Sequence, residues 1–185
     1  MKKTFTFLLI FILACNITGV AQLPTIFMQI NDPGQINGES TSLTHLNWID
    51  IQAFQGGACA TVTISGAGTQ IGQPTTNDFT FTTLVNKTTA HFKNQMYTGS
   101  EIPSVVVDFE TPDGTGTAVI YYKIEMANAF VTSVTEAGND ADGRPLCNIT
   151  LTPRKFRYTY KPFNANGSLG TPVVFGWDRV TQTNW

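Results

Sequence analysis

The chain has few side chains that could carry out acid–base, nucleophilic or metal chemistry. Its 2 histidines are His45 and His91, and it has no nucleophile elbow, phosphate-cradling glycine loop or two-histidine metal motif. His45 precedes a Trp-containing strand and is predicted to be structural, bonding the turn at 38–41; a general base is the alternative. His91 is predicted as a solvated residue of a helix. We therefore expect no catalytic residue, no metal, no cofactor and no enzymatic activity.

Two acidic patterns could suggest a calcium site or a hydrolase. Asp140-Ala141-Asp142-Gly143 resembles the start of a calcium loop, but the downstream acidic ligand of a complete loop is missing, so a turn is predicted. Sugar hydrolysis needs a pair of carboxylates, and no pair stands out in the sequence. A hydrolase is therefore the third choice among the possible functions, supported only by the predicted export and the predicted β-rich fold.

The cysteines give a second, open question. Of the 3 cysteines, Cys15 lies in the predicted export signal, which leaves Cys59 and Cys147 as an even pair in a compartment that permits disulfides. They could form a bridge, and two unpaired thiols are the alternative. The spacing has no second Cys or His pair that would suggest zinc.

The first 21 residues read as an export signal. Lys2 and Lys3 form the charged start, an apolar stretch follows at 5–14, and 19–21 is a small-residue site with cleavage predicted after Ala21. The apolar stretch is shorter than the roughly 20 residues of a membrane-spanning helix. We expect one domain from 22 to 185, exported to the periplasm or secreted. The alternative is a lipoprotein acylated at Cys15.

The charge balance argues against nucleic acid as a partner. Loss of Lys2 and Lys3 leaves 11 − 2 = 9 basic residues against 13 acidic ones, a net charge of 9 − 13 = −4. Phosphate binding needs a concentrated basic surface. The cluster Arg154-Lys155-Arg157 alternates with aromatic residues and is predicted to be the solvated face of a strand.

The remaining pattern predicts many short strands and one helix. Only 13% of the residues are charged, against roughly 25% in an average domain. Strands are expected at 26–30, 48–54, 60–64, 79–85, 104–110, 118–126, 129–134, 148–151 and 156–160. A short helix is expected at about 89–98, with Thr89 as its N-cap and Gly99 closing it. The predicted fold is mainly β, an antiparallel barrel of two packed sheets with one docked helix.

The segment from Gly56 to Asn77 interrupts this pattern. It is rich in Gly, Thr and Gln, and apart from the possible strand at 60–64 it is predicted to be a long excursion. Long loops in compact domains are usually functional or mobile.

Several motifs, in order along the chain, resemble the Hcp family of type VI secretion tube proteins. Asn37-Gly38-Glu39-Ser40-Thr41 leading to Trp48-Ile49 resembles the family's Gly-Glu-Ser-Thr turn and Trp-Ile strand. Further along, Asn86-Lys87-Thr88-Thr89 resembles the family's Asp-Lys-Ala-Ser motif, and Tyr121-Tyr122-Lys123-Ile124 resembles its Tyr-Lys strand. Near the C-terminus, Gly176-Trp177-Asp178 resembles the Gly-Trp-Asp motif at the end of family members. The resemblance covers the chain from about Ile26 onward.

The resemblance implies a fold, a function and partners. It implies a β-barrel with one helix, whose copies close into hexameric rings that stack into a tube, with a spike protein and effector cargo as further partners. The excursion would then be a ring-stacking loop that includes Gly56, Gly57, Thr69, Gln70 and Asn77. Tube subunits of the family carry no export signal, so an exported Hcp-like binding or adhesive protein outside any sheath-driven machine is the second hypothesis.

Overall fold

The computed structural model describes residues 25–31, 35–66, 68–139 and 143–185. It contains one described helix, α1 (Lys87–Thr98), and fourteen strands. The strands before the helix are β1 (Thr25–Asn31), β2 (Gln35–Ile36), β3 (Ile49–Ile51), β4 (Ala53–Gln55), β5 (Ala58–Cys59), β6 (Val62–Ser65), β7 (Gly68–Ile71), β8 (Thr75–Thr76) and β9 (Phe79–Leu84). Those after it are β10 (Glu101–Pro112), β11 (Ala118–Asn139), β12 (Pro145–Tyr160), β13 (Val173–Asp178) and β14 (Thr183–Asn184).

Two sequence predictions fall on residues that lie outside the described ranges. The predicted signal with its cleavage after Ala21, and Cys15, belong to 1–24; most of the predicted turn at Asp140 belongs to 140–142. Within the described ranges, no helix has the length and apolar character needed to cross a membrane.

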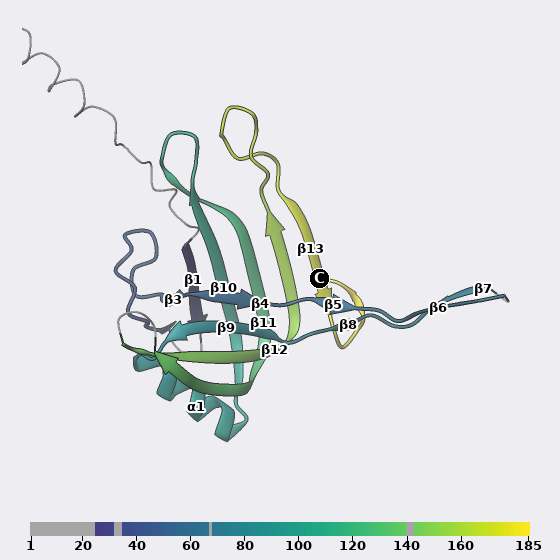
Figure 1. The fold of residues 1–185 in the computed structure, drawn as a ribbon, viewed down its shortest axis with the longest axis horizontal. Coiled ribbons are helices and arrows are strands. Elements are labelled where there is room, and N and C mark those ends of the chain that lie inside the picture. Colours follow the sequence, from purple (N-terminus) through teal and green to yellow (C-terminus); the bar gives the residue numbers. More distant parts are fainter. Residues whose placement is uncertain (1–24, 32–34, 67, 140–142) are drawn as a thin grey trace, which may run out of the picture.

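The main sheet is antiparallel throughout. Its strands follow the order β14, β13, β12, β11, β10, β1 and β2, with β3 also paired to β1 and β9 paired to β12 (Figure 1). The expected strands at 104–110 and 118–126 form a hairpin: β10 pairs with β11, and in the turn between them the Asp113 carboxylate accepts hydrogen bonds from the Thr115 and Thr117 amides, at 2.8 and 3.0 Å. Asp and Gly are the expected residues for such a turn.

The segment 49–55 pairs with two strands that lie far apart in the order of this sheet. β3 pairs with β1 through Ile51↔Ile26 and its neighbours, whereas β4, one residue further on, pairs with β9 through Phe54↔Phe81. One almost continuous segment thus connects β1 with β9, which in turn pairs with β12. The sheet curls into two packed layers, which confirms the predicted antiparallel barrel architecture.

Two strands are longer than the sequence predicts. The predicted pieces 118–126 and 129–134 join into β11, and 148–151 and 156–160 join into β12. In the gaps between the predicted pieces lie Asn128, which has a positive φ of 53°, and Pro153, which has no amide hydrogen to donate to the ladder. The ladder nevertheless continues past them through Ala129↔Pro153. Each of the two strands therefore runs through both layers, with its first half in one layer and its second half in the other.

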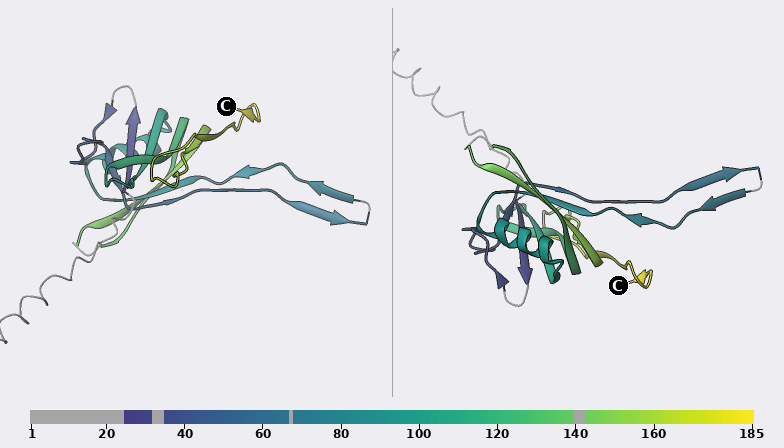
Figure 2. Two further views of the ribbon diagram at one scale, coloured as in Figure 1. Left: turned by 90° about the horizontal axis from the view of Figure 1, so that it is seen from above. Right: turned by 90° about the horizontal axis from the view of Figure 1, so that it is seen from below.

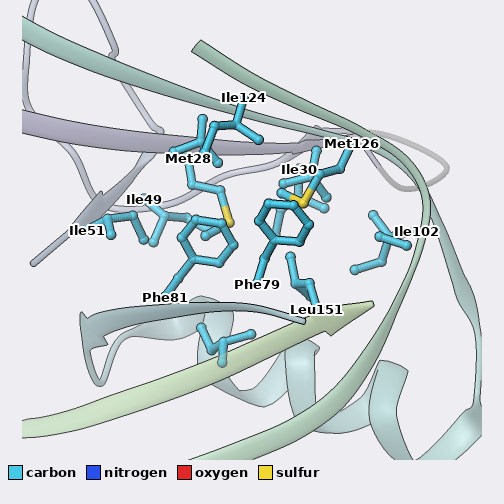
Figure 3. Packing of buried hydrophobic residues seen from close by; sticks show 14 of the residues in the cluster. Met28, Ile30, Ile49, Ile51, Phe79, Phe81, Ile102, Ile124, Met126 and Leu151 are labelled. Carbon is cyan, nitrogen blue, oxygen red and sulfur yellow. The ribbon is translucent and has the colours of Figure 1, made fainter. Parts of the chain in front are cut away.

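The core lies between the two layers. Phe79, Phe81 and Leu151 come from β9 and the first half of β12, and they face Met28 and Ile124 of the opposite layer (Figure 3). All five side chains are fully buried. β9 alternates buried and half-buried residues along its length, as expected for a strand with one face in a core.

Helix α1 covers the outside of β11. The predicted N-cap was wrong by three residues: the Asn86 side chain caps the helix by accepting from the Thr88 amide at 2.8 Å, and Thr89 is the returning member of the capping box, its hydroxyl accepting from the Asn86 amide. The predicted closure at Gly99 is confirmed by its left-handed φ of 63°. Phe92 is fully buried beneath the helix.

Candidate self-assembly surfaces

The segment 56–77 is a two-stranded arm that projects from the barrel (Figure 2). We call residues 56–77 the arm. Its root is the pairing of β5 with β8, its outer part is the pairing of β6 with β7, and between them the Gly72 amide donates to the Thr61 carbonyl at 2.7 Å. The predicted excursion is therefore an ordered antiparallel hairpin rather than an irregular loop.

The outer arm has one apolar face that no part of the described chain covers. Val62 and Ile64 lie two residues apart on β6 and so share a face, and Ile71 of β7 pairs directly with Val62. Their side chains are 52%, 80% and 73% exposed. From Gln55 to Asn77 the sequence has no charged residue, although charges are the usual protection of an exposed strand edge.

The five arm residues expected to serve in stacking divide between root and outer arm. Gly56 lies at the root, where a Cβ atom would come within 2.8 Å of the Phe54 ring, and the Gly57 carbonyl accepts from the Asn77 amide at 2.8 Å. Thr69 and Gln70 lie on β7, opposite Ile64 and Thr63. The structure thus places all five on one arm, three anchoring it and two near its end.

An open aromatic groove lies where the arm leaves the barrel. Its floor is the register pairs Phe156↔Trp177 and Tyr158↔Phe175 of β12 and β13. Its other wall is the arm root, and its volume is about 300 Å³; the remaining lining residues are Gly57, Ala58, Pro74 and Thr76. We call it the aromatic groove. It has no charged lining residue.

Arg179 fixes the arm root against the barrel. Its guanidinium donates to the Pro153 carbonyl at 3.2 Å and to the Thr76 carbonyl at 3.4 Å, and it lies 3.7 Å from the Asp78 carboxylate. Because these partners come from β12, from β8 and from the residue before β9, Arg179 ties the arm root to the barrel beside the groove.

A second projecting feature is the segment between β2 and β3. Gly38 lies so close to the Trp48 carbonyl that a Cβ atom there would be 2.1 Å from it. The Ser40 amide donates to the Trp48 carbonyl and the Asn47 amide to the Ser40 carbonyl, both at 2.9 Å. The segment 41–46, which we call the leucine loop, is held by this closed base, yet Leu43 is 100% and Leu46 60% exposed.

His45 anchors the leucine loop to strand β10. It is 2% exposed, and its Nε2 lies 3.1 Å from Asp108 Oδ2 while its Nδ1 lies 3.3 Å from Glu110 Oε1. Its ring stacks on Phe27 at 4.4 Å, and the Lys123 ammonium lies 3.4 Å from the other Asp108 oxygen. The predicted structural role is supported, but the predicted partner was wrong: the imidazole bonds β10 carboxylates, and backbone hydrogen bonds hold the 38–41 turn.

The two cysteines are unpaired in the structure. Cys59 is exposed at the arm root, whereas Cys147 is fully buried beneath α1, on β12 opposite Thr83. Burial raises the pKa of the Cys147 thiol, and a hydrogen bond with Thr89 offsets this only in part. Of the two alternatives that the sequence left open, the structure has the unpaired thiols, because a buried β12 residue and an arm residue do not meet within one chain. Among the described residues, no group of three or more His, Cys, Asp and Glu side chains is arranged to hold a metal ion.

The leucine loop and the aromatic groove were not predicted as sites. The only sequence signal for the loop was two leucines inside the otherwise polar stretch 35–46. Trp177 enters the sequence analysis only within the family-like ending Gly176-Trp177-Asp178, and Phe175 is not singled out there at all.

Comparison with solved structures places the fold. The chain is similar to "Structure of a type six secretion system protein", with a TM-score of 0.77 and 19% identity over 87% of this chain and 99% of that one. It is also similar to Hcp1 from Salmonella typhimurium, with a TM-score of 0.66 and 17% identity over 88% and 99%. A type VI secretion system effector from Yersinia pestis gives 0.62 and 22% over 83% and 98%. No curated protein sequence matches the chain.

The family assignment comes from the sequence profile. The profile of the family "Type VI secretion system effector, Hcp" matches residues 27–160, which is more than half of the 185 residues. The matched region begins in β1 and ends with β12, so it contains the leucine loop, the arm and the helix. The chain therefore belongs to the Hcp family of type VI secretion proteins.

Proposed function

We propose that the chain is a structural subunit that assembles with copies of itself into rings, and that the rings stack into a tube of the type VI kind. The observation that supports this most directly is the arm: an ordered, uncharged hairpin with an uncovered apolar face. A two-stranded ribbon in water is marginal by itself. The family membership supports an assembly of the type VI kind, because Hcp proteins are type VI secretion proteins. A structural subunit of this kind needs no active site.

The ring and the stack require different contacts. A head-to-tail contact that closes by rotation makes a ring, and a separate contact along the axis makes a stack. The arm is suited to the second kind because it extends well beyond the barrel (Figure 2). We assign the arm to ring stacking, with hexameric rings as the expected size. Spike protein and effector cargo are the further partners expected of such a tube.

Electron microscopy and sedimentation of residues 22–185 test this proposal. Purified protein should form rings at micromolar concentration and stacks at higher concentration. A chain with residues 60–74 replaced by a two-residue Asn-Gly turn, which joins the root pair Cys59↔Thr75 directly, should keep the fold and the rings but lose the stacks. A strict monomer at high concentration would contradict the proposal.

The second candidate is an exported binding or adhesive protein that keeps the Hcp fold outside a secretion machine. The predicted export signal at residues 1–21 favours it, since a tube built in the cytoplasm would need no such signal. Mass spectrometry of the native N-terminus separates the possibilities: a chain starting at Gln22 indicates cleavage, an acylated Cys15 indicates a lipoprotein, and an intact Met1 supports assembly in the cytoplasm.

A further inference from the structure

The leucine loop and the aromatic groove lie at opposite ends of the main sheet. The loop leads into β3, which pairs with β1 at one end, and the groove is formed by β12 and β13 at the other (Figure 1). The leucine loop, the aromatic groove and the apolar face of the outer arm are thus three different surfaces, although the arm root forms one wall of the groove, and only the outer arm is assigned to stacking.

The exposed leucines are unusual because the loop that carries them is ordered. Its base is closed by backbone hydrogen bonds from Ser40 and Asn47, and the buried His45 fixes its centre to β10. Exposed apolar side chains on a preorganised segment lose little conformational entropy when they bind. Two such side chains on one fixed loop can serve as a contact site for another molecule.

The aromatic groove has the complementary character. Its floor ranges from Phe156, which is 3% exposed, to Phe175, which is 53% exposed, so it is open along one side. Its volume of about 300 Å³ is at the low end of the range for small-molecule sites, which suits a few aliphatic side chains. Neither the groove lining nor residues 41–44 and 46 carry a charge, and depletion of charge marks the centre of protein interfaces.

We propose that Leu43 and Leu46 of one copy insert into the aromatic groove of the next copy, and that this contact closes the ring. Because the two surfaces are different and lie at opposite ends of one sheet, the contact is head-to-tail, and each copy offers one loop and one groove. The inference rests on the proposed ring assembly and names the surfaces that make it. Occupation of the groove by the arm of another copy, through Ile64, is the competing arrangement.

A mixing experiment tests the head-to-tail prediction. Leu43→Asp removes the loop contact and leaves the groove, whereas Phe175→Asp removes the groove contact and leaves the loop. Each variant alone should sediment as a monomer, and an equimolar mixture should give dimers and no rings. Tyr97→Asp is the matched control, because Tyr97 is 84% exposed on the helix, and it should form rings like the unsubstituted chain. Circular dichroism and thermal unfolding of every variant show that the fold is retained.

Cross-linking identifies the groove's occupant. In a Cys59→Ser background, Thr41→Cys protein and Ala58→Cys protein, mixed and treated with a short bismaleimide, should give a covalent dimer that neither gives alone. Cys147 is buried and should not react, as the Cys59→Ser protein alone will show.

The outcomes separate this inference from the proposed function. Rings of the unsubstituted chain without the mixed cross-link overturn the loop-and-groove contact and leave the ring proposal standing. A cross-link of Thr41→Cys to itself, or of Ile64→Cys to Ala58→Cys in place of the loop, also overturns it. Absence of any assembly of the unsubstituted chain overturns both.

Discussion

The barrel and the arm are both built by antiparallel pairing, but they differ in the exposure of their apolar side chains. Phe79 and Phe81 on β9 are fully buried, whereas Ile64 and Ile71 on the arm are 80% and 73% exposed. Burial of an aliphatic or aromatic side chain contributes roughly 1.5–3 kcal/mol to folding, and the arm residues gain almost none of it within one chain. The apolar residues of the barrel therefore stabilise the fold, whereas those of the arm are left for the contact between copies that we propose.

Phe81→Ala should have the largest effect on the barrel side of this comparison. Phe81 is fully buried and its ring centroid lies 5.2 Å from that of Phe54. Removal of such a ring leaves a cavity and typically costs about 3–5 kcal/mol. Urea unfolding should show this loss as a lower midpoint with an unchanged slope. A loss below about 1 kcal/mol would mean that β9 does not form the barrel core.

His45→Ala should have a somewhat smaller but still large effect. The substitution leaves the carboxylates of Asp108 and Glu110 buried without the imidazole that lies between them, and a buried polar group that loses its hydrogen-bond partner costs about 1–3 kcal/mol. Lys123, which lies 3.4 Å from Asp108, still partners one of the two carboxylates, so the loss should stay within that range.

Lys93→Ala is the control for His45→Ala. It removes an ion pair with Glu136 whose side chains are 42% and 39% exposed, and exposed pairs contribute about 0–1 kcal/mol. If the two substitutions cost the same in urea unfolding, the cluster around His45 does not hold the leucine loop.

How much of the structure can be predicted from the sequence also differs between the barrel and the surfaces that project from it. The alternation at 79–85 and the glycine at 99 are local signals, and both predicted elements are confirmed. The predicted strands stop near Asn128 and Pro153, whereas β11 and β12 continue past both residues. This continuation depends on the pairing of β11 with β12, which no local sequence pattern reveals.

The misses at the candidate sites also have non-local causes. The bond from His45 to Asp108 spans 63 residues, which no local pattern reveals. The arm lacks the Asn-Gly or Asp-Gly signal of a tight hairpin, so its Gly- and Thr-rich composition suggested a loop.

Asp178→Asn should have a moderate effect that depends on pH. Burial of the Asp178 carboxyl disfavours its charge, but the Val180 and Thr181 amides and the Lys155 ammonium outweigh this and hold its pKa below its ordinary value. A lowered pKa in the folded state adds stability above the unfolded-state pKa, and this stability is lost as the pH falls through the folded-state pKa.

The thermal midpoint should therefore be lower for the Asn variant at neutral pH, and the gap should narrow in acid. Midpoints measured across the acid range test this. A gap that is constant with pH would mean that the charge of Asp178 does not stabilise the turn that follows β13.

The two thiols report the barrel and the arm separately. Cys59 on the arm root should react with a maleimide in the native protein, whereas Cys147, buried and with a raised pKa, should react only after unfolding. Intact mass after native labelling should show one added group on residues 22–185. Two added groups without denaturant would indicate that α1 opens readily, and none would indicate that Cys59 is bridged or covered in an assembly.

Ile64→Ser should have the smallest effect on folding and a large effect on assembly. Because the side chain is 80% exposed, its loss should change the free energy of unfolding by no more than about 0.5 kcal/mol. Stacks should disappear while rings remain, because the apolar face of the arm has lost its central residue. Thr63→Ser, on the opposite face of the same hairpin, is the matched control and should keep the stacks. If Ile64→Ser leaves the stacks intact, or destabilises the chain as a core substitution does, the contrast between a self-sufficient barrel and an arm made for another copy does not hold.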